Sequence, residues 1–182
     1  RVQLMEAAKQ RAFEYGITEG GKNKTNVDVI AGRLLSPQEI EQRQQLITQI
    51  QQKGFTQVME EAAYTWFNRF IALRFMEVNG YLPSKIRVFT DETGAFKPEI
   101  LKQALSVELE DLDRKKVVAL LDAQANEELY KYLLITQCNA LSASLPLMFE
   151  KIENWTELLF PAALLRPGSV LDRLVTDIPE ED

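Results

Sequence analysis

The stretch AYTWFNRFIALRFMEVNGYLP, residues 63–83, decides the fold of this chain. Five of the sixteen aromatic residues fall within twelve positions of it, together with Arg69 and Arg74. On a helical projection of about 100° per residue, apolar side chains cover most of the circumference. A helix that is hydrophobic nearly all round is buried among its neighbours. We therefore expect a central buried helix at about 57–79.

The two arginines of this helix need partners. A buried guanidinium persists only where carboxylates or carbonyls satisfy it. Glu77 lies three positions after Arg74, and Thr65 lies four positions before Arg69, which are spacings at which helical side chains meet. Two interpretations stay open. Either both guanidinium groups reach solvent and pair locally, or they anchor an adjoining domain.

Most of the remaining chain also has the pattern of helices. Ser36 can cap a helix, Pro37 suits its first position, and Glu39 completes a capping box. The helix that follows extends to Gly54, and we expect its glutamines to face water. Other helices are expected at 1–15, 98–105, 113–123, 126–145 and 170–178, with Thr56, Asn126 and Ser169 as further capping residues.

The segment KIRVFTDETGAF, residues 85–96, differs from the rest. Ile86, Val88 and Thr90 alternate with polar residues before a turn, a pattern that predicts a small β-hairpin or an extended loop. The predicted fold class is therefore all-α, a helical bundle-like domain with this one appendage. At 182 residues and 46% hydrophobic, the chain should form a single helical domain over 1–182. It begins and ends beside predicted helices, so we expect it to be a module of a longer protein.

The charge distribution argues against a large nucleic-acid footprint. The net charge is −6, with 14 basic and 12 acidic residues in 1–102 but 7 and 15 in 103–182, a local charge of −8. Proteins that bind DNA mainly through phosphates carry a basic stripe. The one basic run, at 114–116, follows four acidic residues and is typical of a solvated helix face.

The chain contains no histidine and a single cysteine, Cys138. The absence of histidine excludes a Ser/His/Asp triad and histidine-ligated metal sites. Cys138 lies in an apolar run and is predicted to be a buried hydrophobic residue in a reducing compartment. Because no apolar run approaches ~18 residues, we expect a cytoplasmic protein without a membrane partner.

Two short motifs suggest chemistry, and both are weak. Gly16, Gly21 and Lys22 have the spacing of a P-loop, but Asn23 stands where a Ser or Thr is needed, and a helix precedes the motif. The residues 113–115 match half of a D-x-K nuclease site, with Asp91 upstream as a conceivable partner, but on a helix Asp113 and Lys115 would point to different faces. We therefore assign no catalytic, cofactor-binding or metal-binding residues to this chain.

Three segments, 60–90, 94–101 and 171–182, together resemble the N-terminal helical region of the PglX family. These are adenine-specific DNA methyltransferases of BREX (bacteriophage exclusion) systems, and related restriction-modification enzymes share the pattern. The resemblance implies a parent enzyme that uses S-adenosylmethionine to methylate N6 of adenine in double-stranded DNA, for phage defence. Such enzymes hold the flipped adenine with an Asn-Pro-Pro-Tyr-type loop. No two prolines are adjacent here, so the resemblance implies a non-catalytic module.

The resemblance also implies roles for particular residues. In relatives such a module is expected to pack on the catalytic methyltransferase domain in cis and to help hold DNA or other defence-system subunits. The aromatic helix would then supply the core and an edge that meets the catalytic domain. Lys85 and Arg87 become candidate DNA contacts. The candidate structural or domain-docking residues are Trp66, Asn68, Arg69 and Arg74.

Two other functions stay open from the sequence. The acidic segment 103–182 fits a stand-alone helical interaction protein or DNA mimic. The D-x-K motif fits a helical domain of a restriction nuclease.

Overall fold

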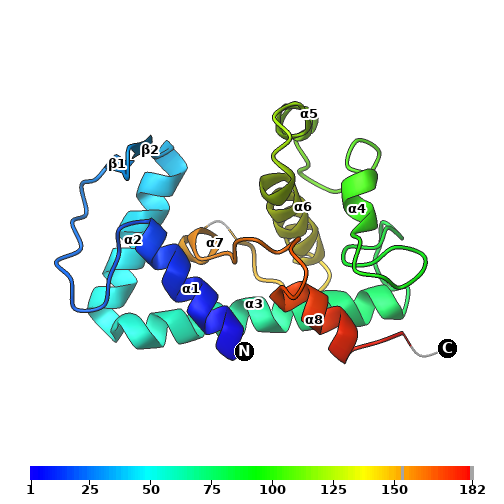
Figure 1. Ribbon diagram of the computed structural model, residues 1–182, viewed down its shortest axis with the longest axis horizontal. Coiled ribbons are helices and arrows are strands. Elements are labelled where there is room, and N and C mark those ends of the chain that lie inside the picture. The colour runs from blue at the N-terminus through cyan, green and yellow to red at the C-terminus, as the bar shows by residue number, and fades with distance from the viewer. Residues whose placement is uncertain (153, 181–182) are drawn as a thin grey trace. The chain divides into compact units, whose positions relative to one another are not determined.

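The computed structural model describes residues 1–152 and 154–180, so the last two residues of the segment 171–182 lie outside it (Figure 1). Over the described residues the chain forms eight helices and one two-stranded antiparallel sheet, which confirms the all-α fold class. The helix α3 confirms the long helix predicted at about 57–79. The elements are α1 Val2–Glu14, β1 Val29–Ile30, β2 Arg33–Leu34, α2 Pro37–Lys53, α3 Phe55–Val78, α4 Glu99–Lys102, α5 Arg114–Asp122, α6 Asn126–Leu141, α7 Trp155–Leu158 and α8 Val170–Asp177.

The chain divides into two compact units, and α3 contributes residues to both. The first unit comprises Arg1–Phe67 and Ile152–Ala162, and the second comprises Asn68–Lys151 and Ala163–Asp182. The single domain expected over 1–182 stays a prediction.

The first unit packs α1, α2, α7 and the first part of α3 around an apolar core. Ala8 and Ala12 on α1 are small enough to bring their helix close to this core. Trp66 is 1% exposed, and its ring lies edge-on to Phe160 with the centroids 4.7 Å apart. Its indole N–H donates to the Thr156 carbonyl at 3.2 Å, so the one polar atom of the ring is satisfied. The other core residues are Tyr15, Ile17, Leu35, Leu46, Ile47, Val58, Met59, Ala62, Leu158 and Leu159.

The start of α2 has the predicted capping box, but the start of α3 does not have the predicted cap. The Ser36 hydroxyl accepts from the Glu39 amide at 3.2 Å, and the Glu39 carboxylate accepts from the Ser36 amide at 2.8 Å. Gly54 ends α2 with a φ of 90°. Because α3 begins at Phe55, Thr56 lies inside the helix, and its hydroxyl donates to Glu19 at 3.2 Å. The prediction that Thr56 is a cap is therefore wrong.

The prediction that the glutamines of α2 face water is wrong for Gln42. This residue is 4% exposed, and its amide donates to the Glu157 carboxylate at 2.8 Å. The neighbouring Arg43 is also buried and donates to the carbonyls of Tyr15 and Lys24. Both polar side chains are satisfied by partners far along the chain, which a local pattern does not reveal.

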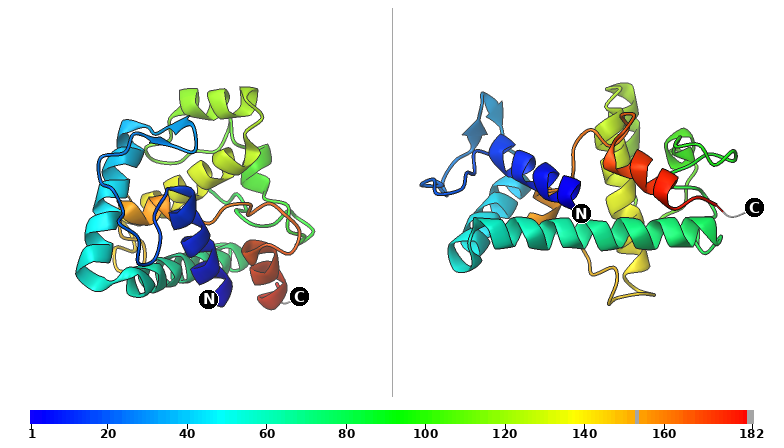
Figure 2. Two further views of the ribbon diagram at one scale, coloured as in Figure 1. Left: turned by 60° about the vertical axis from the view of Figure 1, so that its left-hand side comes forward. Right: turned by 60° about the horizontal axis from the view of Figure 1, so that its bottom comes forward.

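The β-hairpin lies at 29–34, and the segment 85–96 forms the extended loop that was the other predicted outcome (Figure 2). Val29 pairs with Leu34, and Ile30 pairs with Arg33. The two turn residues, Ala31 and Gly32, have φ values of 50° and 78°. A two-residue turn with both φ values positive is the type I′ geometry, which favours Asn-Gly or Asp-Gly. Alanine at the first turn position explains why the sequence did not predict this hairpin.

The second unit is organised around α6, in which nine residues are buried. The phenol of Tyr130 on α6 donates to the Val88 carbonyl at 2.8 Å, and the Phe70 ring on α3 lies edge-on to Phe89. Cys138 is 1% exposed as predicted, and burial raises the pKa of its thiol to about 12. The residue before α6 is Ala125, without a side-chain cap, so the predicted cap at Asn126 is wrong.

Two further observations concern the helices. Ser169 caps α8 as predicted, because its hydroxyl accepts from the Asp172 amide at 3.2 Å. Over the described part of the chain, none of the helices combines the length and the apolar character needed to cross a lipid bilayer.

The different roles of Ser36 and Thr56 can be tested by removing each hydroxyl. Ser36→Ala should lower the free energy of unfolding by about 1 kcal/mol because an N-cap hydrogen bond is lost. Thr56→Ala should change it by less than about 0.5 kcal/mol, as an exposed substitution does. Urea denaturation followed by circular dichroism measures both. Equal losses would mean that α3 is capped by Thr56 after all.

Candidate functional site

The end of α3 carries a buried ion pair between Arg74 and Glu77. The two side chains are 1% and 0% exposed, and the Arg74 Nη1 lies 2.7 Å from the Glu77 Oε1. The Arg74 Nε also donates to the Ile178 carbonyl at 2.9 Å. The predicted pairing of these two residues is confirmed, whereas the interpretation that Arg74 reaches solvent is wrong. A guanidinium removed from water requires such partners.

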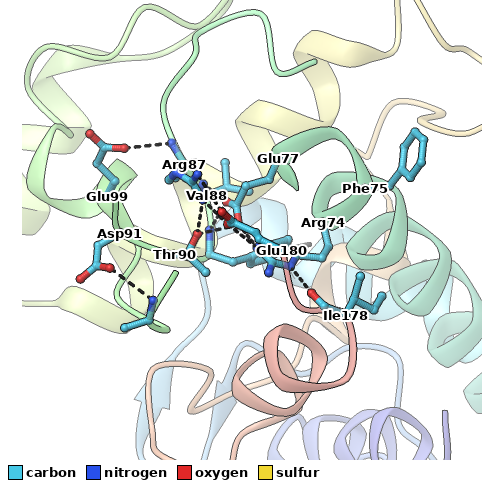
Figure 3. Close-up of polar contacts among 12 residues, drawn as sticks. Arg74, Phe75, Glu77, Arg87, Val88, Thr90, Asp91, Glu99, Ile178 and Glu180 are labelled. Atoms are coloured by element: carbon cyan, nitrogen blue, oxygen red, sulfur yellow. Dashed lines mark hydrogen bonds and ion pairs between the residues drawn. The ribbon is translucent and has the colours of Figure 1, made fainter. Parts of the chain in front are cut away.

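The Glu77 carboxylate accepts hydrogen bonds from four donors (Figure 3). Its Oε2 accepts from the backbone amides of Val88 and Phe89 at 2.6 and 2.7 Å. Its Oε1 accepts from Arg74 and, at 3.0 Å, from the hydroxyl of Thr90. A carboxylate bound in this way joins the end of α3 to the segment 88–90.

The backbone after α3 brings that segment back to Glu77. The helix ends at Val78, and Gly80 adopts a φ of 66°, which favours glycine. The Gly80 amide donates to the Glu77 carbonyl, and the Tyr81 amide donates to the Met76 carbonyl. These bonds close the helix end and reverse the chain direction.

Arg87 extends the network to the C-terminal segment. Its two terminal nitrogens pair with the two carboxylate oxygens of Glu180, and the Nη2 to Oε2 distance is 3.0 Å. Its Nη1 also donates to the Thr90 hydroxyl at 3.0 Å. The hydrogen bonds with Glu180 raise the pKa of Arg87, and the same bonds lower the pKa of Glu180. The Arg74 Nη1 lies 3.4 Å from the Glu180 Oε1. Arg87 and Arg74 therefore both contact the Glu180 carboxylate.

Lys85 and Arg87, the two candidate DNA contacts, lie in different environments. Lys85 is exposed, and its ammonium donates to the Gly80 carbonyl at 2.6 Å. Its φ of 57° is a conformation that non-glycine residues rarely adopt. Arg87 is half-buried and already paired with Glu180. Contact of either residue with DNA stays a prediction.

The four candidate docking residues lie in different environments. Arg69 is 6% exposed, and its Nη2 donates to the Glu150 carbonyl at 2.8 Å. Burial lowers the pKa of the Arg69 guanidinium, so the interpretation that this group reaches solvent is wrong as well. Asn68 is half-buried, whereas Trp66 belongs to the core of the first unit. The docking role of these residues stays a prediction.

Sequence reasoning found Glu77 only as the partner of Arg74, and it missed Thr90 and Glu180. Glu180 lies 93 positions after Arg87 and 106 after Arg74. No local spacing signals a contact over that separation. The alternation at 86–90 was the only available sign that this segment packs against another element.

The weak motifs have structural roles. The Asp113 carboxylate caps α5 by accepting from the amides of Lys115 and Lys116. The Asp91 carboxylate accepts from the amide and hydroxyl of Thr93 within its own turn. Gly16 follows α1 with a φ of 67°, in a helix-to-loop connection instead of a strand-to-loop connection. Within the described ranges, no group of three or more acidic, cysteine or histidine side chains could hold a metal ion.

Comparison with known proteins identifies the class to which the chain is related. No protein-family model matches the chain. Two relatives are adenine-specific methyltransferases. One is PglX of Lacticaseibacillus casei (strain Zhang), 34% identical over an alignment of 207 residues that includes the whole chain. The other is BrxX of Escherichia coli O9:H4 (strain HS), 38% identical over 143 residues and 77% of the chain.

These relatives confirm the resemblance to PglX-type adenine-specific methyltransferases. The chain is much shorter than either of them and spans 17% of the first and 12% of the second. It therefore aligns with only a part of each relative.

The contribution of Glu77 to the stability of the second unit can be tested by truncating its side chain. Glu77→Ala leaves the amides of Val88 and Phe89 buried without their acceptor and removes the closest carboxylate from the buried Arg74. The free energy of unfolding should fall by about 3–5 kcal/mol, as when one partner of a buried ion pair is removed. Urea denaturation of the 182-residue chain measures this loss.

Glu61→Ala is the matched control for Glu77→Ala. Glu61 also pairs with a cation, Lys53, at 2.8 Å, but both side chains are more than a third exposed. Exposed pairs contribute about 0–1 kcal/mol. If the two variants lost the same free energy, the buried network would not stabilise the second unit as described.

Proposed function

We propose that this chain is a non-catalytic N-terminal helical module of an adenine-specific DNA methyltransferase from a phage-defence or restriction-modification system. The observation that carries the proposal is the similarity of the whole chain to PglX, of which it spans only 17%. The parent protein would transfer a methyl group from S-adenosylmethionine to N6 of adenine in double-stranded DNA. The cofactor and the catalytic loop would belong to the rest of the parent.

The chemistry of the chain supports a non-catalytic role. The family resemblance implies that the parent binds the flipped adenine with an Asn-Pro-Pro-Tyr-type loop, which contains two adjacent prolines. The seven prolines of this chain are all separated from one another. The strongest constellation of charged groups, around Glu77, is engaged in internal hydrogen bonds and is buried. The Glu77 carboxylate itself is inaccessible to solvent, so it can fix the geometry of its neighbours but cannot exchange protons with a substrate.

An exposed aromatic pair supports packing of the module on the catalytic domain. Phe75 and Tyr81 are 57% and 60% exposed, and their ring centroids lie 6.0 Å apart. Figure 3 shows Phe75 directed away from the network that holds Arg74 and Glu77. Exposed aromatic residues of this kind are enriched in protein interfaces. We assign this pair to the edge that meets the catalytic domain, with Arg74 fixing that edge from within.

Lys85 and Arg87 remain the proposed contacts with DNA phosphates. Lys85 is the more accessible of the two, and its left-handed backbone conformation is the kind of local strain that clusters at functional positions. The acidic segment 103–182 limits such contacts to a few phosphates, so most of the DNA-binding surface would lie elsewhere in the parent. Other defence-system subunits would add to that surface.

The docking edge can be tested in the full-length parent methyltransferase. Phe75→Ser combined with Tyr81→Ser should lower N6-adenine methylation of plasmid DNA by about tenfold or more, because aromatic anchors dominate interface energies. Leu105→Ser combined with Val118→Ser is the matched control, since these residues are also exposed in the second unit. Thermal unfolding of the 182-residue chain should be nearly unchanged in both.

Two results would count against the proposed function. Full methylation by the double variant Phe75→Ser with Tyr81→Ser would show that this aromatic pair does not form the docking edge. Methyl transfer to duplex DNA by the 182-residue chain alone, supplied with S-adenosylmethionine, would contradict the non-catalytic role.

A further inference from the structure

Glu180 occupies a position built for an anion. Two terminal nitrogens of Arg87 meet its two carboxylate oxygens, and the Arg74 Nη1 lies 3.4 Å from its Oε1. A planar guanidinium with two parallel N–H groups fits the oxygens of a phosphate as well as those of a carboxylate. The carboxylate of Glu180 therefore stands where a phosphate group could bind.

Glu180, unlike Glu77, can move away without breaking the rest of the hydrogen-bond network. Among the described residues, Glu180 accepts hydrogen bonds only from Arg74 and Arg87, and its side chain is 29% exposed. It lies beyond the end of α8 at Asp177. Glu77 has four donors and no exposure. Displacement of Glu180 would leave every hydrogen bond of Glu77 in place.

Loss of Glu180 removes one negative charge from beside Arg74 and Arg87. The Glu77 carboxylate still pairs with Arg74, and the Glu99 carboxylate accepts from the Arg87 amide at 3.3 Å. Among the described residues, the Arg87 guanidinium then keeps only its hydrogen bond to the Thr90 hydroxyl. The Arg87 side chain is 27% exposed, which leaves it accessible from solvent. Lys85, two residues earlier, adds a second exposed cation on the same loop.

The space and the charges around Glu180 favour a singly charged anion at this position. A hollow of about 520 Å³ adjoins Glu180 and Arg74 and has room for a phosphate group. Glu92 and Asp172 also line it, and their charges oppose a dianion more than a monoanion. A phosphodiester carries one negative charge, whereas free inorganic phosphate near pH 7.5 carries nearly two. The site therefore fits a phosphodiester better.

We propose that Arg74 and Arg87 form a binding site for one phosphodiester of a DNA backbone, and that Glu180 covers this site until DNA displaces it. The choice of DNA rests on the proposed function. Residues 178–180 and the DNA backbone then compete for the same two guanidinium groups. The partly exposed ion pair of Arg87 with Glu180 acts as an internal inhibitor of binding.

The test measures binding of a fluorescent duplex oligonucleotide to the 182-residue chain at low salt. Glu180→Gln should tighten binding about 5- to 10-fold, as gain of one charge-assisted contact implies. The slope of log affinity against log salt should steepen by roughly 0.9, the value for one additional phosphate. Glu110→Gln removes one charge at an exposed position outside the hollow and controls for net charge. An equal gain in both variants would overturn the proposal.

A double variant tests whether the gain in DNA affinity depends on Arg87. Glu180→Gln with Arg87→Gln should bind the duplex no better than the unaltered chain, and a retained gain would overturn the role of Arg87. Thermal unfolding of each variant checks that the fold is intact. Inorganic phosphate at millimolar concentration should not displace the duplex from Glu180→Gln. Displacement would show a free-phosphate site instead of a DNA site.

The binding test is independent of the test of the proposed function. If the parent methylates adenine and Glu180→Gln binds DNA no more tightly than Glu110→Gln, the proposed phosphodiester site is contradicted and the proposed function is supported. If Glu180→Gln gains affinity through Arg87 and the parent transfers no methyl group, the site stands and the function is wrong.

Discussion

The carboxylate of Glu77 is the constraint on which the second unit depends. A buried charge costs several kcal/mol in lost hydration, and the cost is offset only when every lone pair finds a good donor. Here Arg74 supplies one donor from the same helix, and the backbone of Val88 and Phe89 supplies two more. The segment that follows α3 must therefore return to this carboxylate.

This arrangement separates the groups that hold the structure from the groups that are available for contacts. Arg74 and Glu77 are sequestered, whereas Phe75, on the same helix, presents its ring to solvent. Arg87 and Glu180 form a partly exposed pair at the rim of the network. Under the proposed function, the module would do no chemistry itself, but it would offer an aromatic edge to a neighbouring domain and an anion site to a nucleic acid.

Local patterns predicted what depends on local chemistry. The apolar circumference predicted α3, and the capping box predicted the start of α2, because each is determined within a few residues. The hairpin at 29–34 was not predicted because Ala31 occupies a turn position where Asn or Gly is the usual signal. Glu180 was not predicted as the partner of Arg87 because contacts over that separation arise from tertiary packing. The same limit explains the buried Gln42.

Hydrogen exchange of the Val88 and Phe89 amides tests most directly whether Glu77 holds its segment in place. Both amides lie outside helices and strands, and their acceptor is one side chain. The network predicts that they exchange as slowly as the amides of buried Leu134 in α6, through opening of the whole second unit. Exchange within seconds at neutral pH, while the Leu134 amide stays protected, would contradict the account.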